Sequence, residues 1–595
     1  MGCSRVVMFS VLTTSLLGVL SLNGCVGANK ASKQAEPVAN AATVLESLPE
    51  SDVPTPSTLA SPVFEVADQG VRSTGLVEPG AKVVAENAVY DVVVIGGGVP
   101  GMTSALYLTN GGKKVLLLDR GPKLGVDALW SESRDHVRLQ RNRPEHVDSH
   151  QETIEILKQL NLEPAEREPV SFPAGYFVRG KFHADPWNAK NLEKLPVELR
   201  LFLTEVRRAQ SENKIPSPPF EEFVKYGGSM DLDSMNVETW IRSMPAAVGK
   251  RGGNRPEVVS MDKVVELADL YCRANFGADA KAVSAMAFAS FFSADLEGRR
   301  SSVLGNDGVV AALVETLENR AMLFLAKVNA PVTSITQDDG GIEVSYNQGD
   351  ESHRARGKYV VFAERLEFAP ELIQGMEIDA EQVAQMKDTK LESFVEFSLL
   401  TSGQPYLAAA NTWLQLDEVV ENDITHLMVA NWEQVAPPTA GLSKKQFARR
   451  TKEVKPEEFL VRQHLSAGQR GIGEANLKFL GFAAASRVEK IFSLFPRDLL
   501  PGLQGKFAVE KITGRRYLDA THAPKPGFFT TGARRLRRPV GRVFFASNSL
   551  GAPSMEEALF RGHCAASSIL ARINKAYRLE SWSRCPLDPP KGVRP

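Results

Sequence analysis

The sequence predicts an α/β fold in which a Rossmann-type domain is interleaved with a mixed α+β domain. Three observations predict it. A strand, a glycine turn, a helix and a second strand follow one another in residues 90–120. Residues 186–292 alternate apolar and charged positions mostly at helical spacing, and a last strand, loop and helix occupy residues 542–573. We therefore expect one α/β domain assembled from stretches of chain that a helical segment separates.

The first segment has the order of elements that binds a dinucleotide: strand, glycine turn, helix, strand and acid. We expect Gly96 to make the tight turn, Gly98 to let the backbone approach a pyrophosphate, and Gly101 to let the helix pack on the strand. The N-terminus of the helix presents free N–H groups and a partial positive charge to the phosphates. Asp119 ends the second strand, where it can accept hydrogen bonds from a ribose. The alternative is a βαβ unit without a ligand.

Composition is that of an ordinary globular protein. The chain has 595 residues, a formal net charge of -1 and 43% hydrophobic residues, so we expect two or more domains and no nucleic-acid partner. One run is strongly basic: Arg534, Arg535, Arg537, Arg538 and Arg542. It is interpreted as a solvated loop before a strand; a site for an anionic ligand or lipid is the alternative.

Residues 1–25 have the pattern of a targeting segment. Arg5 gives a basic start, residues 6–22 form an apolar core, and Leu22-Asn23-Gly24-Cys25 ends it. This ending resembles the lipobox of bacterial lipoproteins. The resemblance implies that Cys25 is lipidated and anchors the protein to the bacterial outer membrane, on its periplasmic or cell-surface side. A short membrane-spanning anchor is the alternative, although the core is polar at several positions and short for that role.

Residues 26–87 are rich in Ala, Ser, Pro and Glu without sustained periodicity, which predicts a disordered tether. The remaining cysteines, Cys272, Cys564 and Cys585, form no even set, so we expect a fold that does not depend on disulfides. His146 and His150 have the spacing of two metal ligands on a helix, but no third ligand is nearby. We therefore expect no metal site.

The C-terminal segment predicts a second site for negative charge. Residues 542–546 form a buried-strand run, and residues 547–553 form a loop. Ser554 is a suitable N-cap for the following helix, with Glu557 three residues on as its capping-box partner. A strand, a loop and a capped helix N-terminus thus recur far from the first glycine turn.

These segments together resemble the flavin amine oxidase, protoporphyrinogen oxidase and phytoene desaturase superfamily. The resemblance implies an FAD-binding domain in residues 88–145, 300–370 and 505–575, and a substrate or cap domain in residues 146–299 and 371–504. A C-terminal tail, residues 576–595, remains. By the same resemblance the FAD-binding residues are Gly96, Gly98, Gly101, Asp119, Val332, Asn548, Met555 and Glu556. Of these, Val332 would contact the adenine through its backbone, and Met555 and Glu556 would begin the helix that faces the flavin.

Three departures from the family pattern affect the chemistry. The Gly-Gly-Arg that follows the ribose acid in the family is reduced to Leu124-Gly125-Val126, and Asn548 replaces an acid. The lysine that many amine oxidases place over flavin N5 would fall near Ser393 or Phe394, where there is none. Tyr517 takes the place of a family tryptophan and is our candidate catalytic residue, as an aromatic wall that orients substrate.

The leading interpretation is an FAD-dependent oxidoreductase that abstracts a hydride from an organic amine or a related small substrate. No cysteine lies between Lys506 and Asn548, where relatives attach flavin, so we expect non-covalent FAD. The alternatives are a polyene desaturase or isomerase and a lipid-anchored flavin-binding protein without turnover. The expected partners are a small-molecule substrate and, through Cys25, a membrane; the electron acceptor is left open.

Overall fold

The computed structural model describes a large part of the chain. The described residues are 63–66, 82–125, 145–146, 149–162, 175–178, 181–184, 188–213, 215, 229–248, 257–297, 300–301, 305–389, 391–402, 412–416, 426–430, 457–465, 474–493, 508–581 and 583–586. All of them belong to one compact unit, Ala60–Pro595. Residues 1–25 with the lipidation site Cys25, and most of the expected tether, lie outside the described residues.

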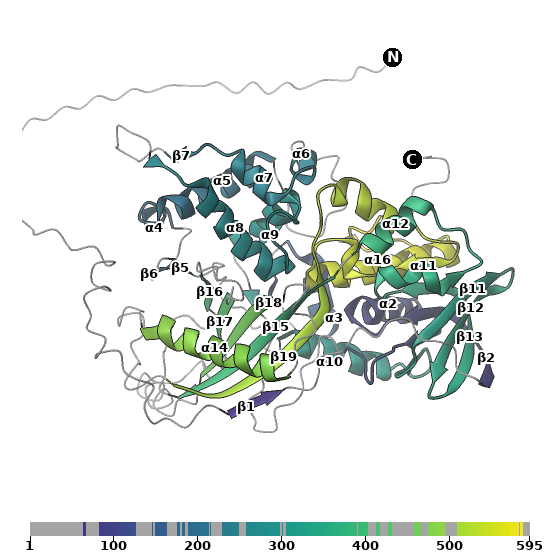
Figure 1. Ribbon diagram of the computed structural model, residues 1–595. Helices are drawn as coiled ribbons and strands as arrows, with labels where there is room; N and C mark the ends of the chain where they lie inside the picture. The colour runs from purple at the N-terminus through teal and green to yellow at the C-terminus, as the bar shows by residue number, and fades with distance from the viewer. Residues whose placement is uncertain are drawn as a thin grey trace, which may run out of the picture. The chain divides into compact units, whose positions relative to one another are not determined.

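The first sheet is the predicted parallel sheet with an antiparallel extension (Figure 1). Its order is β10-β3-β2-β13-β12-β11-β14, and β20 also pairs with β13. Its parallel strands are β10 (Phe324–Lys327), β3 (Val115–Leu118), β2 (Lys82–Ile95), β13 (Glu351–Phe362) and β20 (Val543–Phe545). The others are β12 (Gly341–Gln348), β11 (Val332–Asp338) and β14 (Ile373–Gln374). Strands β2 and β3 bury continuous runs of Val, Leu and Ile, as strands covered on both faces do.

The helices that share a buried core with this sheet include α2 (Val99–Asn110), α3 (Gln151–Gln159), α10 (Gly305–Glu318) and α16 (Met555–Ile573). Helix α16 crosses close to α2, because Gly562 has no side chain to separate them. A Cβ there would lie 2.4 Å from the Pro100 carbonyl oxygen. The Ser104 hydroxyl donates to the Gly562 carbonyl at 3.0 Å across the same contact. Helices α2 and α16, which lie far apart in the sequence, therefore pack together in one layer.

The second sheet has the order β1-β19-β15-β18-β17-β16-β5-β6 and is mostly antiparallel. Its strands are β1 (Val63–Val66), β19 (Ala508–His522), β15 (Leu391–Ser402), β18 (Glu457–Leu465), β17 (His426–Ala430), β16 (Thr412–Leu416), β5 (Gly175–Val178) and β6 (Lys181–Ala184). Helix α14 (Glu474–Ser493) packs on β19. Together the parallel sheet and this region confirm the predicted fold class.

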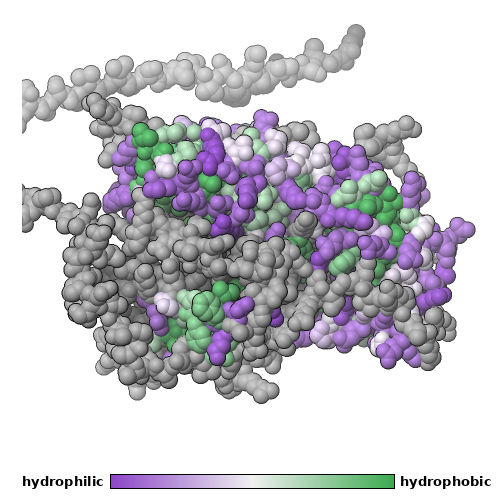
Figure 2. All heavy atoms as spheres, in the orientation of Figure 1, coloured by the Kyte–Doolittle hydropathy of each residue, from purple (hydrophilic) through white to green (hydrophobic). Residues whose placement is uncertain are grey.

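The helical cap contains α4 (Ala189–Leu192), α5 (Val197–Asn213), α6 (Ser229–Asp233), α7 (Val237–Arg242), α8 (Met261–Phe276) and α9 (Ala285–Glu297). Its core is aromatic: Phe288 packs against Phe202, Tyr271 and Phe292 with ring centroids 5.0–5.8 Å apart. Offset and edge-on rings at this spacing are favourable. On the face shown in Figure 2, the surface over these helices is largely hydrophilic. No helix among the described residues is long and apolar enough to cross a membrane.

The remaining elements are short. Two small ribbons pair β4 (Glu145–His146) with β9 (Arg300–Ser301) and β7 (Ala247–Val248) with β8 (Glu257–Val258). The short helices are η3 (Leu366–Phe368), α11 (Ala369–Leu372), α12 (Ala380–Asp388), the π-helix η6 (Phe528–Gly532), α15 (Ala533–Leu536) and the 3₁₀-helix η7 (Asn548–Leu550). Of these, α15 and η7 lie closest in sequence to the predicted C-terminal site.

Three domain boundaries differ from expectation. Strand β19 pairs with β15, so residues 508–522 belong to the second sheet and not to the FAD-binding pieces. Helix α3 packs on α16 and belongs with the first sheet, not with the cap. Residues 63–66 and 82–87, expected within the tether, form β1 and the start of β2. A short apolar pattern predicts a strand but does not say which sheet it joins.

The described residues contain one disulfide that the cysteine count did not predict. Cys564, in α16, and Cys585, in the expected tail, are joined by a disulfide. Only Cys272 is a free cysteine among the described residues, and it is buried in α8. The cysteine count did not predict the bond, because Cys272 makes the number of remaining cysteines odd. The two bonded cysteines are also separated by 21 residues in the sequence.

Candidate active site

The glycine turn after β2 has the geometry predicted for it. Gly96 has a φ of +103°, which side chains rarely allow, and a Cβ there would lie 2.9 Å from the Ala363 carbonyl oxygen. A Cβ on Gly101 would lie 1.9 Å from the Gly96 carbonyl oxygen. These two glycines are therefore required by the protein's own packing of helix α2 on the sheet.

Gly98 is different, because none of the described residues requires a glycine there. Its φ is -69°, and the nearest atom to an added Cβ would be Pro100 Cδ at 3.8 Å, an ordinary contact. Gly98 is the N-cap of α2, which has no side-chain cap and no acid in its first turn. Space and uncapped N–H groups at a helix N-terminus suit a phosphate group. The residues present thus fit a pyrophosphate.

Asp119 lies beside this turn at the end of β3. Its carboxylate accepts hydrogen bonds from the backbone N–H groups of Gly97 and Gly121, the latter at 2.6 Å. Burial raises the pKa of Asp119, and these two hydrogen bonds oppose that shift. The Asp119 carbonyl accepts from Ala330 N–H at 2.8 Å, which brings the start of β11, with Val332, next to the acid. The predicted ribose and adenine residues are thus neighbours.

An arginine pair beside Asp119 was missed from the sequence. Arg120 and Arg365 place their guanidinium carbons 5.1 and 4.9 Å from the centre of the Phe368 ring. Arg120 also lies 3.4 Å from the Glu364 carboxylate. Stacked guanidinium groups are held in a fixed plane. The available signal was the position of Arg120 directly after the ribose acid.

The C-terminal loop begins at the same edge of the sheet as the glycine turn. Phe362 of β13 is in register with Ile95 of β2 on one side and with Phe545 of β20 on the other. The carboxyl ends of the three strands therefore align, which is where open α/β sheets bind ligands. Asn548, in η7, follows β20 by three residues. Two sites far apart in sequence are thus brought together.

The start of α16 agrees in part with the predicted capping box. The Ser554 hydroxyl accepts from Glu557 N–H at 3.1 Å, so Ser554 is the N-cap. The Glu557 carboxylate lies against Gly551 and accepts from Arg561 at 2.5 Å. Glu557 and Arg561 therefore support the loop that precedes the helix.

Met555 and Glu556 differ from each other in position. Met555 is half-buried and packs against the apolar core below the first sheet. Glu556 is buried, and its carboxylate accepts from the backbone N–H groups of Glu152 and Thr153 at 3.1 and 2.7 Å. The Glu556 side chain therefore caps the N-terminus of α3, while the residue itself lies in the first turn of α16, as expected. Its role toward the flavin stays a prediction. Burial, with Glu152 nearby, raises the pKa of Glu556 to about 7.

Tyr517 lies in β19, where it pairs with Phe394 of β15. The lysine that many amine oxidases carry would fall near Ser393 or Phe394. The backbone register therefore puts the candidate aromatic residue directly beside the position without a lysine. Ser393 is fully buried in β15. Its role and that of Tyr517 stay predictions.

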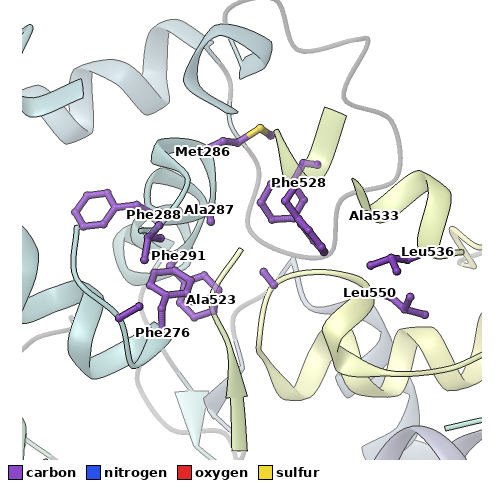
Figure 3. Close-up of a cluster of buried hydrophobic side chains, with 14 of the residues drawn as sticks. Phe276, Met286, Ala287, Phe288, Phe291, Ala523, Phe528, Ala533, Leu536 and Leu550 are labelled. Carbon is purple, nitrogen blue, oxygen red and sulfur yellow. The ribbon is translucent and has the colours of Figure 1, made fainter. Parts of the chain in front are cut away.

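The cap meets the C-terminal segment in an apolar cluster (Figure 3). The cluster joins cap residues such as Phe276, Phe288 and Phe291 to Phe528 and Leu550 of the segment that leads to α16. The buried Asp233 of α6 ties the two parts together. Its carboxylate accepts from Ser284 Oγ and from Thr530 N–H, both at 2.8 Å. The π-helix η6 is therefore anchored to the cap beside the Asn548 loop.

The basic run is bound largely by the protein itself. Arg535 lies 2.6 Å from Glu381, Arg538 lies 3.8 Å from Asp379, and Arg537 donates to the Leu550 carbonyl. These contacts favour a structural role over an anion site. The pair His146 and His150 gains no further ligand, since the described residues contain no group of three His, Cys, Asp or Glu that could hold a metal.

Comparison with known proteins agrees with this geometry. A family model described as "FAD binding domain" matches residues 91–164. The (S)-6-hydroxynicotine oxidase of Paenarthrobacter nicotinovorans is 54% identical over 46 residues, which are 8% of this chain. The matched stretch spans only 11% of that curated relative's length.

Solved structures resemble the chain over most of its length. A putrescine oxidase bound to putrescine has a TM-score of 0.56 at 14% identity and covers 82% of this chain and 100% of its own. Cyclohexylamine oxidase from Brevibacterium oxydans IH-35A has a TM-score of 0.54 at 18% identity and covers 81% and 99%. At such identities the likeness concerns the fold. The chain thus shares its fold with these two amine oxidases and carries a segment that matches an FAD-binding domain.

Proposed function

We propose that the protein binds FAD non-covalently and oxidises an organic amine by removing a hydride. The observation that carries this proposal is Gly98: the protein leaves space and uncapped N–H groups at this one glycine of the turn, as a pyrophosphate requires. The amine class is supported by the fold that the chain shares with a putrescine oxidase and a cyclohexylamine oxidase.

The described residues divide into those that would hold each part of FAD. Gly96, Gly98 and the N-terminus of α2 would hold the pyrophosphate, and Asp119 the adenosine ribose. The backbone at Val332 would meet the adenine. At the other end, Asn548 and the N–H groups at the start of α16, beside Met555, would meet the ribityl chain and the ring. When bound, FAD supplies a two-electron acceptor.

The chain's own part in the reaction is to hold and orient. The cap cluster around Phe288 and Phe528 excludes water beside the Asn548 loop, and Tyr517 would orient the substrate as an aromatic wall. The backbone N–H groups in the first turn of α16 would stabilise the negative charge that develops on the flavin ring when it is reduced. A flavin-binding protein without turnover is the second candidate, favoured by the buried Ser393 where amine oxidases carry a lysine.

The places of the cysteines support non-covalent attachment. Cys564 and Cys585 are joined to each other, and Cys272 is buried in the cap. None of these three sulfurs is available to the cofactor. Acid precipitation should therefore release all the flavin into the supernatant, and yellow protein in the pellet would disprove this part of the proposal.

Gly98→Val tests the site itself. We expect this variant to fold normally, because its Cβ meets no protein atom closer than 3.8 Å, and to lose FAD binding in a fluorescence titration. Gly101→Ala is the matched control, since its methyl group collides with the protein at 1.9 Å and should lower stability instead. A Gly98→Val protein that binds FAD as tightly as wild type would refute the site.

We propose, as a separate point, that the mature protein is anchored through lipidated Cys25 at the bacterial outer membrane. The support is the apolar run that ends in Leu22-Asn23-Gly24-Cys25. Two acyl chains are enough for stable attachment.

A further inference from the structure

The chain turns back after α16 and runs along that helix toward its beginning. This return segment comprises residues 574–581 and 583–586. The Tyr577 and Ser567 hydroxyls are 3.1 Å apart, and Glu580 lies 3.7 Å from His563. Next to His563, Cys564 is bonded to Cys585. The contacts thus proceed from the end of α16 back toward its first turn.

The return segment places the guanidinium group of Arg584 beside the Glu556 carboxylate. Arg584 donates to the Glu556 carboxylate at 3.1 Å, with its guanidinium carbon 6.0 Å from the centre of the Phe560 ring. The Arg584 side chain is 39% exposed, whereas that of Glu556 is fully buried. Arg584 therefore enters from solvent, one residue before the disulfide that fixes its position.

Glu556 has a specific need for a cation because a second buried carboxylate, Glu152, lies beside it. Glu152 has its own donors: it accepts from Tyr107 and pairs with His563, both at 2.9 Å. His563 stacks on Tyr107 with ring centroids 3.9 Å apart. Around Glu556 the remaining contacts are neutral donors on Thr153 and the α3 backbone. Arg584 is thus the charge that balances Glu556 among the described residues.

The position of Glu556 links its ion pair with Arg584 to the candidate active site. Its carboxylate joins the first turn of α16 to the first turn of α3, and Glu152 joins α3 to α2 through Tyr107. Helices α2 and α16 are the two whose N-terminal ends lie at the sheet edge described above. Removing the cation leaves an ionised carboxylate buried and unbalanced at their junction, which is costly.

We propose that Arg584 is a positioning residue: the disulfide-fastened return segment holds it on Glu556, and this pair fixes the junction of α16, α3 and α2 behind the dinucleotide turn. The effect on the junction stands without the proposed function, whereas an effect on FAD rests on it. Reduction by a dithiol breaks the Cys564–Cys585 bond, forms two thiols and oxidises the reductant to its disulfide. It frees the return segment and so weakens the pair.

The first test measures the thermal unfolding midpoint of Arg584→Met at about pH 8 and about pH 5.5. Glu556 is ionised at the higher pH and neutral at the lower, so the midpoint should fall only at the higher pH. Arg578→Met is the matched control, because Arg578 lies on the same segment and bonds only to backbone carbonyls there. In a Glu556→Gln background, Arg584→Met should change nothing. An equal loss at both pH values, or a loss that persists in that background, would overturn the proposal.

The second test adds a dithiol to the oxidised protein and measures the same midpoint together with the FAD dissociation constant. Reduction should reproduce the pH-dependent loss of Arg584→Met and raise the dissociation constant about three- to tenfold at about pH 8, as the loss of a partly buried pair does. The Glu556→Gln protein should resist both effects. A midpoint that falls with no change in FAD affinity would limit Arg584 to stability and contradict its positioning role. Failure to bind FAD in any state would refute the proposed function and leave the midpoint test standing.

Discussion

At the scale of single residues, Glu556 shows how burial converts an ordinary carboxylate into a group that responds to pH. Its pKa is raised from 4.5 to about 7, and the first cause is burial. The folded state therefore binds a proton more tightly than the unfolded state. Stability from this proton is complete below about pH 4.5 and is lost as the pH rises through 7.

Glu556→Gln should remove that dependence. Between about pH 4 and pH 8 the wild type should lose about 3 kcal/mol of unfolding free energy relative to the glutamine variant, because its pKa is 4.5 in the unfolded state and about 7 in the folded state. Urea unfolding at a series of pH values measures it. If the two proteins keep a constant difference over this range, the raised pKa is wrong.

Tyr517 carries the prediction about substrate. Because it pairs with Phe394 beside the position that lacks a lysine, we expect it to act as a wall and not as an acid or base. Tyr517→Ala should slow flavin reduction at least tenfold, about 1.4 kcal/mol of barrier, with FAD still bound, and Tyr517→Phe should be mild. Stopped-flow absorbance distinguishes them. Equal loss in both variants would assign chemistry to the hydroxyl.

The residue roles that the sequence predicted correctly are those with local causes. Gly96 and Gly101 follow from the turn and the helix that flank them, and Ser554 follows from the three residues after it. The contact of the Glu556 side chain with α3 could not be predicted, since α3 lies about 400 residues earlier in the chain. No local pattern contains such a contact.

At the scale of elements, the site depends on how closely α16 approaches α2. Gly562→Ala would place a methyl group 2.4 Å from the Pro100 carbonyl and 2.7 Å from Thr103. We expect a loss of about 1–3 kcal/mol in unfolding free energy, as overpacking costs, with weaker FAD binding because both helices begin at the site. Ser568→Ala on the same helix is the control. Unchanged stability in Gly562→Ala would show that the helices can separate freely.

The elements themselves were predictable where their periodicity is long or their caps are strong. The strand, turn, helix and strand of residues 90–120 match β2, α2 and β3. The sheet to which β19 belongs was not predictable. Strands pair through backbone hydrogen bonds, which nearly every residue can make, so the sequence of β19 does not specify its partner strand. The contacts of the return segment were not predictable either, because Cys585 and Arg584 hold it in place by binding residues that are far from them in the sequence.

At the scale of the whole molecule, the lipid anchor that we propose at Cys25 would determine where the protein works. Cys25→Ser should move the protein from the membrane fraction to the soluble periplasmic fraction, because the substitution removes the site of the two proposed acyl chains. Fractionation followed by immunoblotting measures the change. Retention of the Cys25→Ser protein in the membrane fraction would rule out lipidation at this residue.

The central claim is that this fold carries a working flavin that accepts electrons from an amine. The most direct measurement mixes the FAD-loaded protein anaerobically with a panel of amines, putrescine and cyclohexylamine among them, and follows the absorbance of oxidised flavin. The account predicts that at least one primary amine bleaches the flavin in the wild type, and that the Tyr517→Ala protein responds more slowly. A protein that binds FAD and keeps its full oxidised spectrum with every amine, while dithionite bleaches it, would contradict the claim and leave a flavin-binding protein without turnover.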